Sequence, residues 1–393
     1  MAMKRVQSIE RRIRVIEQGD FLGTLMPTLP FARKDEDCFL AVSLFSGAGG
    51  LDMGFRAAGF DIIWANDFNA DACETYKANI GDHIRCGDIE RFMKDLAQFS
   101  GKVDLLIGGP PCQGFSVAGK MNPDDPRSQN VWRYLQALEI VRPKSFLMEN
   151  VKALGTLEKW KPVRERLLSG MKDLGYNVGY TVVNASDFNV PQNRERVLFV
   201  GFLSEKKGTL DLAEELRPYR VKSPSVRDVL QRLDRPGTGN NVTVCRARIT
   251  FCTRPVMRKS PYAGMLFNGA GRPIRIDGYC ATLPASMGGN KTPFVDEAEL
   301  YDNEESFVER YHRGLADGSI SPEFKEAPKR LRRLTVEEAA ALQTFPAWYK
   351  FKGARSSMYR QIGNAVPCNL AYQVAKMIKA RLVAMRLEAK GGR

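Results

Sequence analysis

Residues 103–116 read Val-Asp-Leu-Leu-Ile-Gly-Gly-Pro-Pro-Cys-Gln-Gly-Phe-Ser. The apolar run at its start has the length and composition of a buried β-strand. Two glycines and two prolines then end the strand and exclude a regular helix over the next residues. We therefore expect Cys112 at the tip of a stiff turn beyond the carboxyl end of a strand, where ligands bind in open α/β sheets. A small buried cysteine is the ordinary alternative, but packing does not require two prolines before the thiol.

A glycine-rich turn precedes this element. Residues 39–45 form a buried-type strand that runs into Ser-Gly-Ala-Gly-Gly at 46–50 and then into a helix. Such a turn lets the backbone approach a ligand closely. Its glycine order differs from Gly-x-Gly-x-x-Gly, which disfavours a nicotinamide oxidoreductase. The next two strands end in Asp67 and Asp88, which are placed to accept hydrogen bonds from an adenosine, although either aspartate could instead cap the following helix.

Charged residues also follow the later strands. An apolar strand ends in Glu149, at the sheet edge expected for Cys112, and a glutamate there is costly unless it is hydrogen-bonded or functional. The sequence Pro-Gln-Asn-Arg-Glu-Arg then carries Arg194 and Arg196, which share one face of an extended backbone. A surface ion-pair ladder is the plain alternative for the two arginines, and a ligand-binding pair is the functional one.

The excess positive charge of the chain is concentrated in one segment. The whole chain has a net charge of +14, which indicates a polyanionic partner. Residues 216–275 hold 13 lysines and arginines against 2 acidic residues, whereas residues 276–328 hold 4 against 11. Helical periodicity also fades from about residue 204 to 328. A solvated basic face is possible, but a block this uneven favours phosphate binding.

The two ends of the chain have helical patterns. Val6, Ile9, Ile13 and Ile16 have helical spacing, which predicts a short amphipathic helix. We expect it to pack on the main domain, and an arm that contacts DNA is the alternative. Near the other end, Thr335 and Glu338 predict a capping box that starts a helix. A last helix is expected to reach about residue 387.

Composition excludes several classes of protein. No run of about 18 apolar residues exists, which argues against a membrane span. The charged N-terminus lacks the apolar core of a secretion signal, so we expect a cytoplasmic, nucleoid-associated protein with reduced cysteines. The eight cysteines form no Cys-x-x-Cys pair and lack a nearby histidine, so no metal site is predicted.

Three motifs in order resemble those of the DNA (cytosine-5-)-methyltransferases of bacterial restriction–modification systems. They are Pro-Pro-Cys at 110–112, Glu-Asn-Val at 149–151 and Gln-x-Arg-x-Arg at 192–196. The resemblance covers residues 39–203 and 329–375. It implies an α/β fold, with the Rossmann-like mixed sheet of S-adenosylmethionine-dependent methyltransferases, helices on both faces, and a smaller irregular β-rich target-recognition domain.

The resemblance also implies a division of the chain. It consists of an N-terminal extension (1–36), a catalytic and cofactor-binding domain (37–203), a target-recognition domain (204–328) and a C-terminal segment that returns to the catalytic domain (329–393). The expected partner is double-stranded DNA, without a membrane or a metal. We expect a monomer that is paired in function with a restriction endonuclease and needs no stable complex with it.

The implied reaction is methyl transfer from S-adenosylmethionine to carbon 5 of a cytosine flipped out of a specific duplex. Cys112 would add to carbon 6, Glu149 would stabilise charge at ring nitrogen 3, and Arg194 and Arg196 would hold the ring oxygen and orient the glutamate. A transfer-RNA cytosine-5 methyltransferase and a non-catalytic DNA-binding relative are the alternatives. Residues 114–127 could close as a lid.

Binding residues are carried over from the family position by position. The implied cofactor site comprises Phe45, Gly47, Gly49, Gly50, Asp67, Phe68, Asp88, Ile89, Pro110, Asn364 and Ala365, with Phe68 or Ile89 against the adenine. Many relatives carry glutamate at the position of Asp67, so the carboxylate is preserved. The implied DNA or base contacts are Gln113, Ser116, Arg272 and Thr282.

Overall fold

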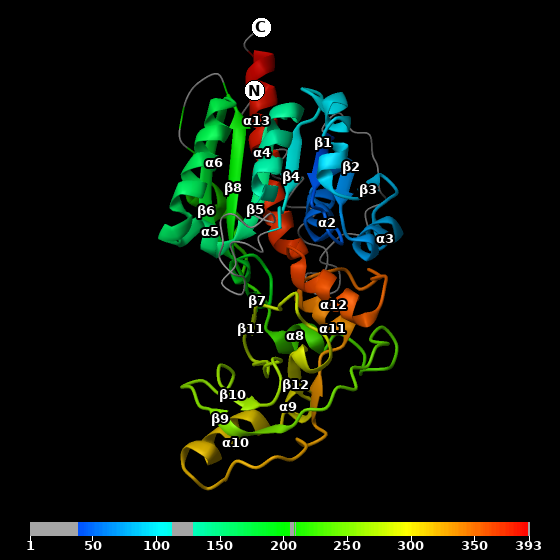
Figure 1. Ribbon diagram of the computed structural model, residues 1–393, viewed down its shortest axis with the longest axis vertical. Coiled ribbons are helices and arrows are strands. Elements are labelled where there is room, and N and C mark those ends of the chain that lie inside the picture. Colours follow the sequence, from blue (N-terminus) through cyan, green and yellow to red (C-terminus); the bar gives the residue numbers. More distant parts are fainter. Residues whose placement is uncertain (1–37, 112–128, 205–207, 209, 392–393) are drawn as a thin grey trace.

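A seven-stranded sheet forms the centre of the larger of two lobes in this computed structural model, which describes residues 38–111, 129–204, 208 and 210–391 (Figure 1). Across the sheet the strands are β3 (Ile84–Cys86), β2 (Phe60–Asp67), β1 (Phe39–Leu44), β4 (Leu105–Gly108), β5 (Ser145–Val151), β8 (Glu195–Leu203) and β6 (Tyr176–Asn184). The first five run parallel, and β8 is antiparallel to both of its neighbours. The mixed α/β sheet predicted from the sequence is confirmed.

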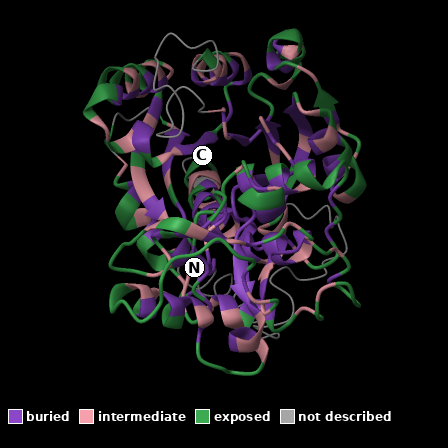
Figure 2. Ribbon diagram, turned by 60° about the horizontal axis from the view of Figure 1, so that its bottom comes forward, coloured by how far each residue is buried: buried purple, intermediate pink, exposed green. Residues whose placement is uncertain are grey.

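Helices cover both faces of this sheet. One face packs against α4 (Asn130–Val141) and α6 (Lys161–Asp173), and the other packs against α2 (Gly50–Ala57) and α13 (Cys368–Gly391). Three further helices contact the sheet: α3 (Ala70–Asn79) packs against β2 and β3, α5 (Lys152–Thr156) against β5, β6 and β8, and α7 (Leu212–Leu216) against β6. Because both faces are covered, the middle strands consist mostly of apolar residues, and Figure 2 shows the buried centre of the molecule.

The strand order reverses between β1 and β4. β1 pairs with β2 on one side and with β4 on the other, and Leu44 lies opposite Gly108 at the carboxyl end. Ligands of doubly wound sheets bind in the crevice at such a point. The glycine turn after β1 and the turn at 109–111 after β4 therefore leave the sheet side by side, which positions the candidate site.

The smaller lobe is irregular and is built from short elements. It contains the antiparallel pairs β9 (Phe251–Val256) with β10 (Met265–Phe267) and β12 (Phe294–Asp296) with β13 (Leu331–Arg333), and the helices α8 (Val226–Leu230), α9 (Glu297–Tyr301) and α10 (Phe307–Ala316). An aromatic cluster that includes Phe251, Phe267 and Tyr311 forms its own small core. The pair β7 (Gln192–Asn193) and β11 (Cys280–Ala281) connects the two lobes.

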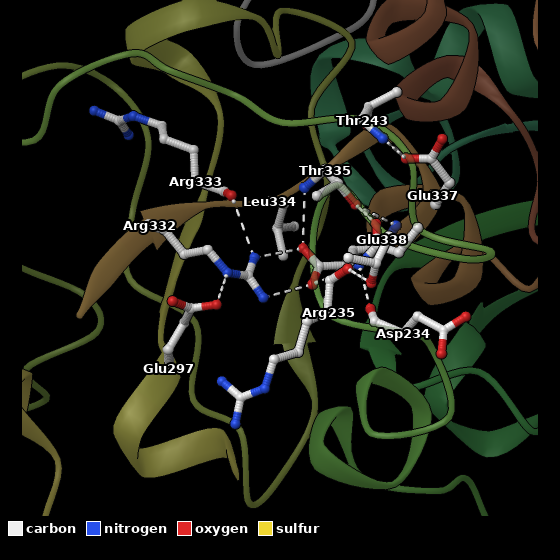
Figure 3. Close-up of polar contacts among 12 residues, drawn as sticks. Asp234, Arg235, Thr243, Glu297, Arg332, Arg333, Leu334, Thr335, Glu337 and Glu338 are labelled. Carbon is white, nitrogen blue, oxygen red and sulfur yellow. Dashed lines mark hydrogen bonds and ion pairs between the residues drawn. The ribbon is translucent and has the colours of Figure 1, made fainter. Parts of the chain in front are cut away.

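A buried ion-pair cluster fixes the start of α11 (Val336–Leu342) to this lobe (Figure 3). The predicted capping box is confirmed: Glu338 N donates to Thr335 Oγ1 at 3.0 Å, and Thr335 N donates to Glu338 Oε2 at 2.9 Å. Both oxygens of Glu338 also accept from Arg332, at 2.7 and 2.8 Å, and Arg332 Nε donates to Glu297 at 2.6 Å. The helix α12 (Arg355–Asn364) follows and leads back toward the sheet.

The described residues contain neither a membrane-spanning helix nor a cluster of metal-ligating side chains. No helix among them has both the length and the apolar character that a membrane span needs. In the same part of the chain, no group of three or more His, Cys, Asp or Glu residues is arranged to hold a metal ion. The predicted N-terminal helix over Val6–Ile16 lies outside the described residues.

Candidate active site

The turn after β1 has a backbone shape that suits close ligand approach. Phe45, Gly47 and Gly49 have φ angles of 55°, 56° and 81°, all in the left-handed region. For Phe45 this is an uncommon conformation, of the kind that concentrates at ligand sites. A Cβ added at Gly47 would meet no atom within 4 Å, so the backbone there faces free space. A ligand can therefore lie directly against Gly47.

The side chain of Asp67, at the end of β2, is hydrogen-bonded to this turn. Its Oδ2 accepts from Gly47 N and its Oδ1 accepts from Asn69 N, both at 2.8 Å. Burial raises the pKa of Asp67, and hydrogen bonds from the backbone N–H groups of Asn69, Gly47 and Phe68 oppose that rise. A carboxylate has about four acceptor positions, so Asp67 can also accept from a ligand hydroxyl. Phe68, the next residue, is 67% exposed and offers an apolar face beside the carboxylate.

Asp52 lies beneath the same turn and is fully buried. It accepts from Tyr76 Oη at 2.9 Å and from Ser43 Oγ at 3.0 Å. Burial raises its pKa from 3.8 to about 6, because these hydrogen bonds only partly replace the lost hydration. Between pH 3.8 and about pH 6, Asp52 keeps its proton in the folded chain and has released it in the unfolded chain. Folding stability from this group is therefore present at low pH and is lost as the pH rises toward 6.

Replacing Asp52 by asparagine removes this titration and keeps an oxygen acceptor for Tyr76 Oη. We expect D52N to gain about 1–3 kcal/mol relative to the wild type as the pH rises from about 4 to 7. Urea unfolding of both proteins at each pH measures the difference. If the difference in free energy of unfolding between D52N and the wild type did not change with pH, a raised pKa of the buried Asp52 would be contradicted.

Asp88 adopts the capping role that the sequence left open. Its side chain accepts from Glu90 N at 3.0 Å and from Arg133 Nη1 at 3.3 Å. Ile89 is buried in the core under α4, so Phe68 is the exposed apolar side chain of the two predicted to lie against adenine. No local pattern in the sequence indicated Arg133, because it lies 45 residues from Asp88.

The C-terminal segment packs against the glycine turn and the start of α2. A Cβ on Gly50 would lie 3.1 Å from the Cβ of Ala365 and 2.4 Å from Val366 O, so the segment touches the start of α2. Tyr349 Oη donates to Ala48 O inside the glycine turn. The predicted cofactor residues Asn364 and Ala365 are thereby brought next to a turn more than 300 residues earlier in the chain, and Asn364 is exposed there.

Glu149 faces the turn that leads to Cys112. A Cβ added at Gly109 would lie 3.1 Å from Glu149 Oε2, and Asn150 Nδ2 donates to Pro110 O at 3.1 Å. Arg196 Nε lies 2.9 Å from Glu149 Oε1, and both side chains are largely buried. The structure thus brings three predicted site residues together, Pro110, Glu149 and Arg196. Cys112, Gln113 and Ser116 lie outside the described residues.

Arg194 does not share this position. It is 2% exposed, and its Nη1 and Nη2 donate to Leu283 O at 3.3 Å and to Gly363 O at 3.0 Å. The expectation that both arginines occupy one face beside Glu149 is therefore corrected: Arg194 lies between two segments of main chain, and only Arg196 contacts the carboxylate. The physical reason is that Arg194 lies between β7 and β8, where β11 and α12 converge.

The predicted DNA contacts lie in the smaller lobe and at its junction. Thr282 is exposed, and its Oγ1 donates to Asn193 O at 2.8 Å. Arg272 is half-buried and donates to Gly269 O of its own loop at 3.1 Å. Six exposed cations of this lobe form no ion pair with any residue that the structure describes; they are Arg246, Arg248, Arg254, Arg258, Lys259 and Arg275. This part of the basic segment is available to phosphate groups.

The sheet is doubly wound, with a glycine turn after its first strand, carboxylates after the next strands and a Pro-Pro turn at the switch point. This arrangement is typical of the Rossmann-like class that binds nucleotides and related cofactors. The sequence model described as C-5 cytosine-specific DNA methylase matches residues 39–380. The chain therefore belongs to the C-5 cytosine-specific DNA methylase family and is a DNA cytosine-5 methyltransferase.

Individual relatives agree with this assignment. The chain is 31% identical to the Type II methyltransferase M1.HphI of Haemophilus parahaemolyticus over 352 residues, covering 86% of each chain. It is 32% identical to the Type II methyltransferase M.FnuDI of Fusobacterium nucleatum over 365 residues, covering 87% of this chain and 94% of the relative. The crystal structure of the S. pombe Dnmt2 methyltransferase has the same fold, with a TM-score of 0.61, 21% identity, and coverage of 88% of this chain and 99% of the other.

The family and the fold imply the use of S-adenosylmethionine, and the residues around the glycine turn fit such a molecule. The free space at Gly47, the remaining lone pairs of Asp67 and the exposed ring of Phe68 supply a backbone cradle, hydroxyl acceptors and an apolar face. These are the contacts that an adenosine requires.

Proposed function

We propose that this chain methylates carbon 5 of a cytosine that is flipped out of a specific DNA duplex, through a covalent adduct between Cys112 and carbon 6. The observation that carries the proposal is the contact of Arg196 with Glu149 at 2.9 Å, with the second glutamate oxygen against Gly109 of the Pro-Pro-Cys turn. A carboxyl group and a thiol presented by neighbouring strand ends can act on two atoms of one ring.

Each side chain has a separate role in this reaction. The Cys112 thiolate forms a bond to carbon 6, and the displaced electron pair moves toward ring nitrogen 3, where Glu149 donates or shares a proton. Arg196 fixes the orientation of Glu149 through Nε. The addition makes carbon 5 nucleophilic. A methyl group would then pass from the sulfonium sulfur of S-adenosylmethionine to carbon 5, and the sulfur would leave as the neutral thioether of S-adenosylhomocysteine. Loss of the carbon 5 proton to a base, return of the ring nitrogen 3 proton to Glu149 and cleavage of the bond between Cys112 and carbon 6 restore the ring.

S-adenosylmethionine would supply an electrophilic methyl group on its sulfonium sulfur. Phe45, Gly47, Gly49, Gly50, Asp67, Phe68, Asn364 and Ala365 would hold it along the crevice, with Asp88 and Pro110 at its ends. The glycine turn would supply close backbone contact, and Asp67 would accept from the ribose hydroxyls.

The smaller lobe is the proposed reader of the DNA sequence. The target atom cannot be reached inside a duplex, so the base must leave the stack before it reacts. Exposed cations of the lobe, with Arg272 and Thr282, would contact the DNA, and Gln113 and Ser116 would face it from the catalytic side. Protection of host DNA against a cognate endonuclease, which needs no stable complex with this chain, follows as the biological role.

The test is a methyl-transfer assay with labelled S-adenosylmethionine on duplex DNA and, in parallel, on transfer RNA. We expect 5-methylcytosine in the duplex, identified by mass spectrometry of the nucleosides, at a defined sequence found by bisulfite sequencing. Incorporation of label into transfer RNA alone would identify RNA, and not DNA, as the substrate. Binding of the duplex without incorporation of label would indicate a non-catalytic relative that only binds DNA.

A further inference from the structure

We propose that Arg194 is a positioning residue that couples recognition of the DNA sequence to the cofactor side of the site. Its guanidinium bridges the recognition lobe at Leu283 and the end of α12 at Gly363. This inference rests on the proposed function, because it assumes that the smaller lobe binds DNA and that the segment after Gly363 binds S-adenosylmethionine.

On the recognition side, the bridge ends on a tightly held segment. Leu283 N donates to Gln192 Oε1 at 3.0 Å, and Thr282 Oγ1 donates to Asn193 O at 2.8 Å. The strands β7 and β11 pair immediately before these contacts. Because these contacts are close, a shift of Thr282 on contact with DNA also shifts the backbone next to Arg194.

On the cofactor side, the bridge ends one residue before the crevice. Gly363 O accepts from Arg194, and Asn364 and Ala365 follow directly. The two segments also touch each other here, since a Cβ on Gly363 would lie 2.4 Å from Pro284 O. A change in the recognition segment at Pro284 thus reaches the end of α12, and Arg194, which binds a carbonyl of each segment, makes the two segments move together.

A second connection runs parallel to this bridge. Gln192 Nε2 donates to Gln343 Oε1 at 3.0 Å, and Gln343 Nε2 donates to Ile362 O at 2.7 Å and to Ala365 O at 3.1 Å. The chain that carries Gln192 and Arg194 continues to Arg196, which holds Glu149. One short stretch therefore contacts the recognition segment, the cofactor-side segment and the carboxylate of the pocket.

The choice of arginine agrees with a positioning role. Burying a guanidinium is costly, and an apolar side chain of similar volume would fill the same space. A planar fork, in contrast, fixes two carbonyl oxygens at a set separation and angle, which lysine cannot do with a single ammonium group. The structure pairs the fork with carbonyls from two different parts of the chain, 89 and 169 residues away.

The test measures the coupling between the two ligands. The affinity for S-adenosylhomocysteine is determined by calorimetry with and without the duplex identified in the methylation assay, for the wild type, R194K and R333K. Arg333 is the matched control: it is equally buried, and its Nη1 and Nη2 donate to Thr292 O and Arg248 O, both within the recognition segment. Melting curves establish that each variant is folded.

We expect the duplex to tighten binding of S-adenosylhomocysteine about 5–150-fold in the wild type and in R333K, the range typical of coupled sites. In R194K the factor should fall about threefold or more toward 1, because the Arg194 bridge is lost and only the connection through Gln192 and Gln343 remains. Should R194K not fold, G363A tests the same junction with Arg194 intact, since the added Cβ pushes Pro284 away and should also lower the factor.

Two results would overturn the inference. One is a wild-type factor near 1, and the other is a factor in R194K or G363A equal to that of the wild type. Failure of the proposed function is distinguishable from both, because in that case the wild type methylates no duplex at all, and the inference falls with it.

Discussion

Replacing Cys112 by serine is expected to lower the rate of methyl transfer to duplex DNA about 10⁴-fold, the largest effect of any single change. A hydroxyl is far less ionised than a thiol at neutral pH, so addition to carbon 6 fails and carbon 5 remains unreactive. Binding of S-adenosylhomocysteine and of duplex DNA should stay within a few-fold of the wild type. Single-turnover transfer of labelled methyl groups measures the rate.

The matched control is C38S. Cys38 precedes β1 at the amino end of the strand, at the sheet edge opposite to the glycine turn, and is half-buried. Its replacement should leave the transfer rate within about twofold of the wild type. A C112S protein with more than a tenth of the wild-type rate would contradict the covalent mechanism.

Replacing Glu149 by glutamine is expected to lower the rate of methyl transfer by a factor of about 10²–10⁴. Glutamine preserves the volume and one oxygen acceptor for Arg196 Nε, but it carries no acidic proton for ring nitrogen 3. The effect should therefore appear in kcat, with the affinity for S-adenosylhomocysteine unchanged. Steady-state kinetics of E149Q on duplex DNA separate kcat from KM.

Glu195 provides the matched comparison for this change. It lies on the same strand as Arg196 and pairs with Lys152 at 2.8 Å, but both partners are about half exposed. Exposed pairs of this kind contribute little, so E195Q should retain nearly full activity. Equal losses in E149Q and E195Q would show that general disturbance of β8, and not the chemistry of Glu149, explains the effect.

The parts of the site that the sequence predicted correctly are those set by local patterns. Apolar runs ended by glycine, proline or acidic residues located the strand ends, and a parallel sheet brings those ends to one edge. This reasoning placed Asp67, Glu149 and the turn before Cys112 on the correct edge of the sheet. It also predicted the capping box at Thr335, because a capping box involves only residues three positions apart.

The parts that the sequence could not predict depend on long-range packing. Arg194 and Arg196 have the same residue type and an i, i+2 spacing, yet one binds main-chain carbonyls and the other a carboxylate. The partners of Arg194 come from segments that no periodicity connects to it. Likewise, both roles of Asp88 agreed with its position after a strand, and only the three-dimensional arrangement of Glu90 and Arg133 shows the capping contact.

The most direct test of the covalent account uses duplexes that carry 5-fluorocytosine in the methylated sequence. Fluorine at carbon 5 prevents the last elimination, so an enzyme that uses the proposed route stays attached to the DNA in the presence of S-adenosylmethionine. We predict a band of slower mobility on denaturing electrophoresis for the wild type and C38S, and none for C112S. Absence of the band in a wild-type protein that methylates the same sequence, or its persistence in C112S, would contradict the proposed role of Cys112.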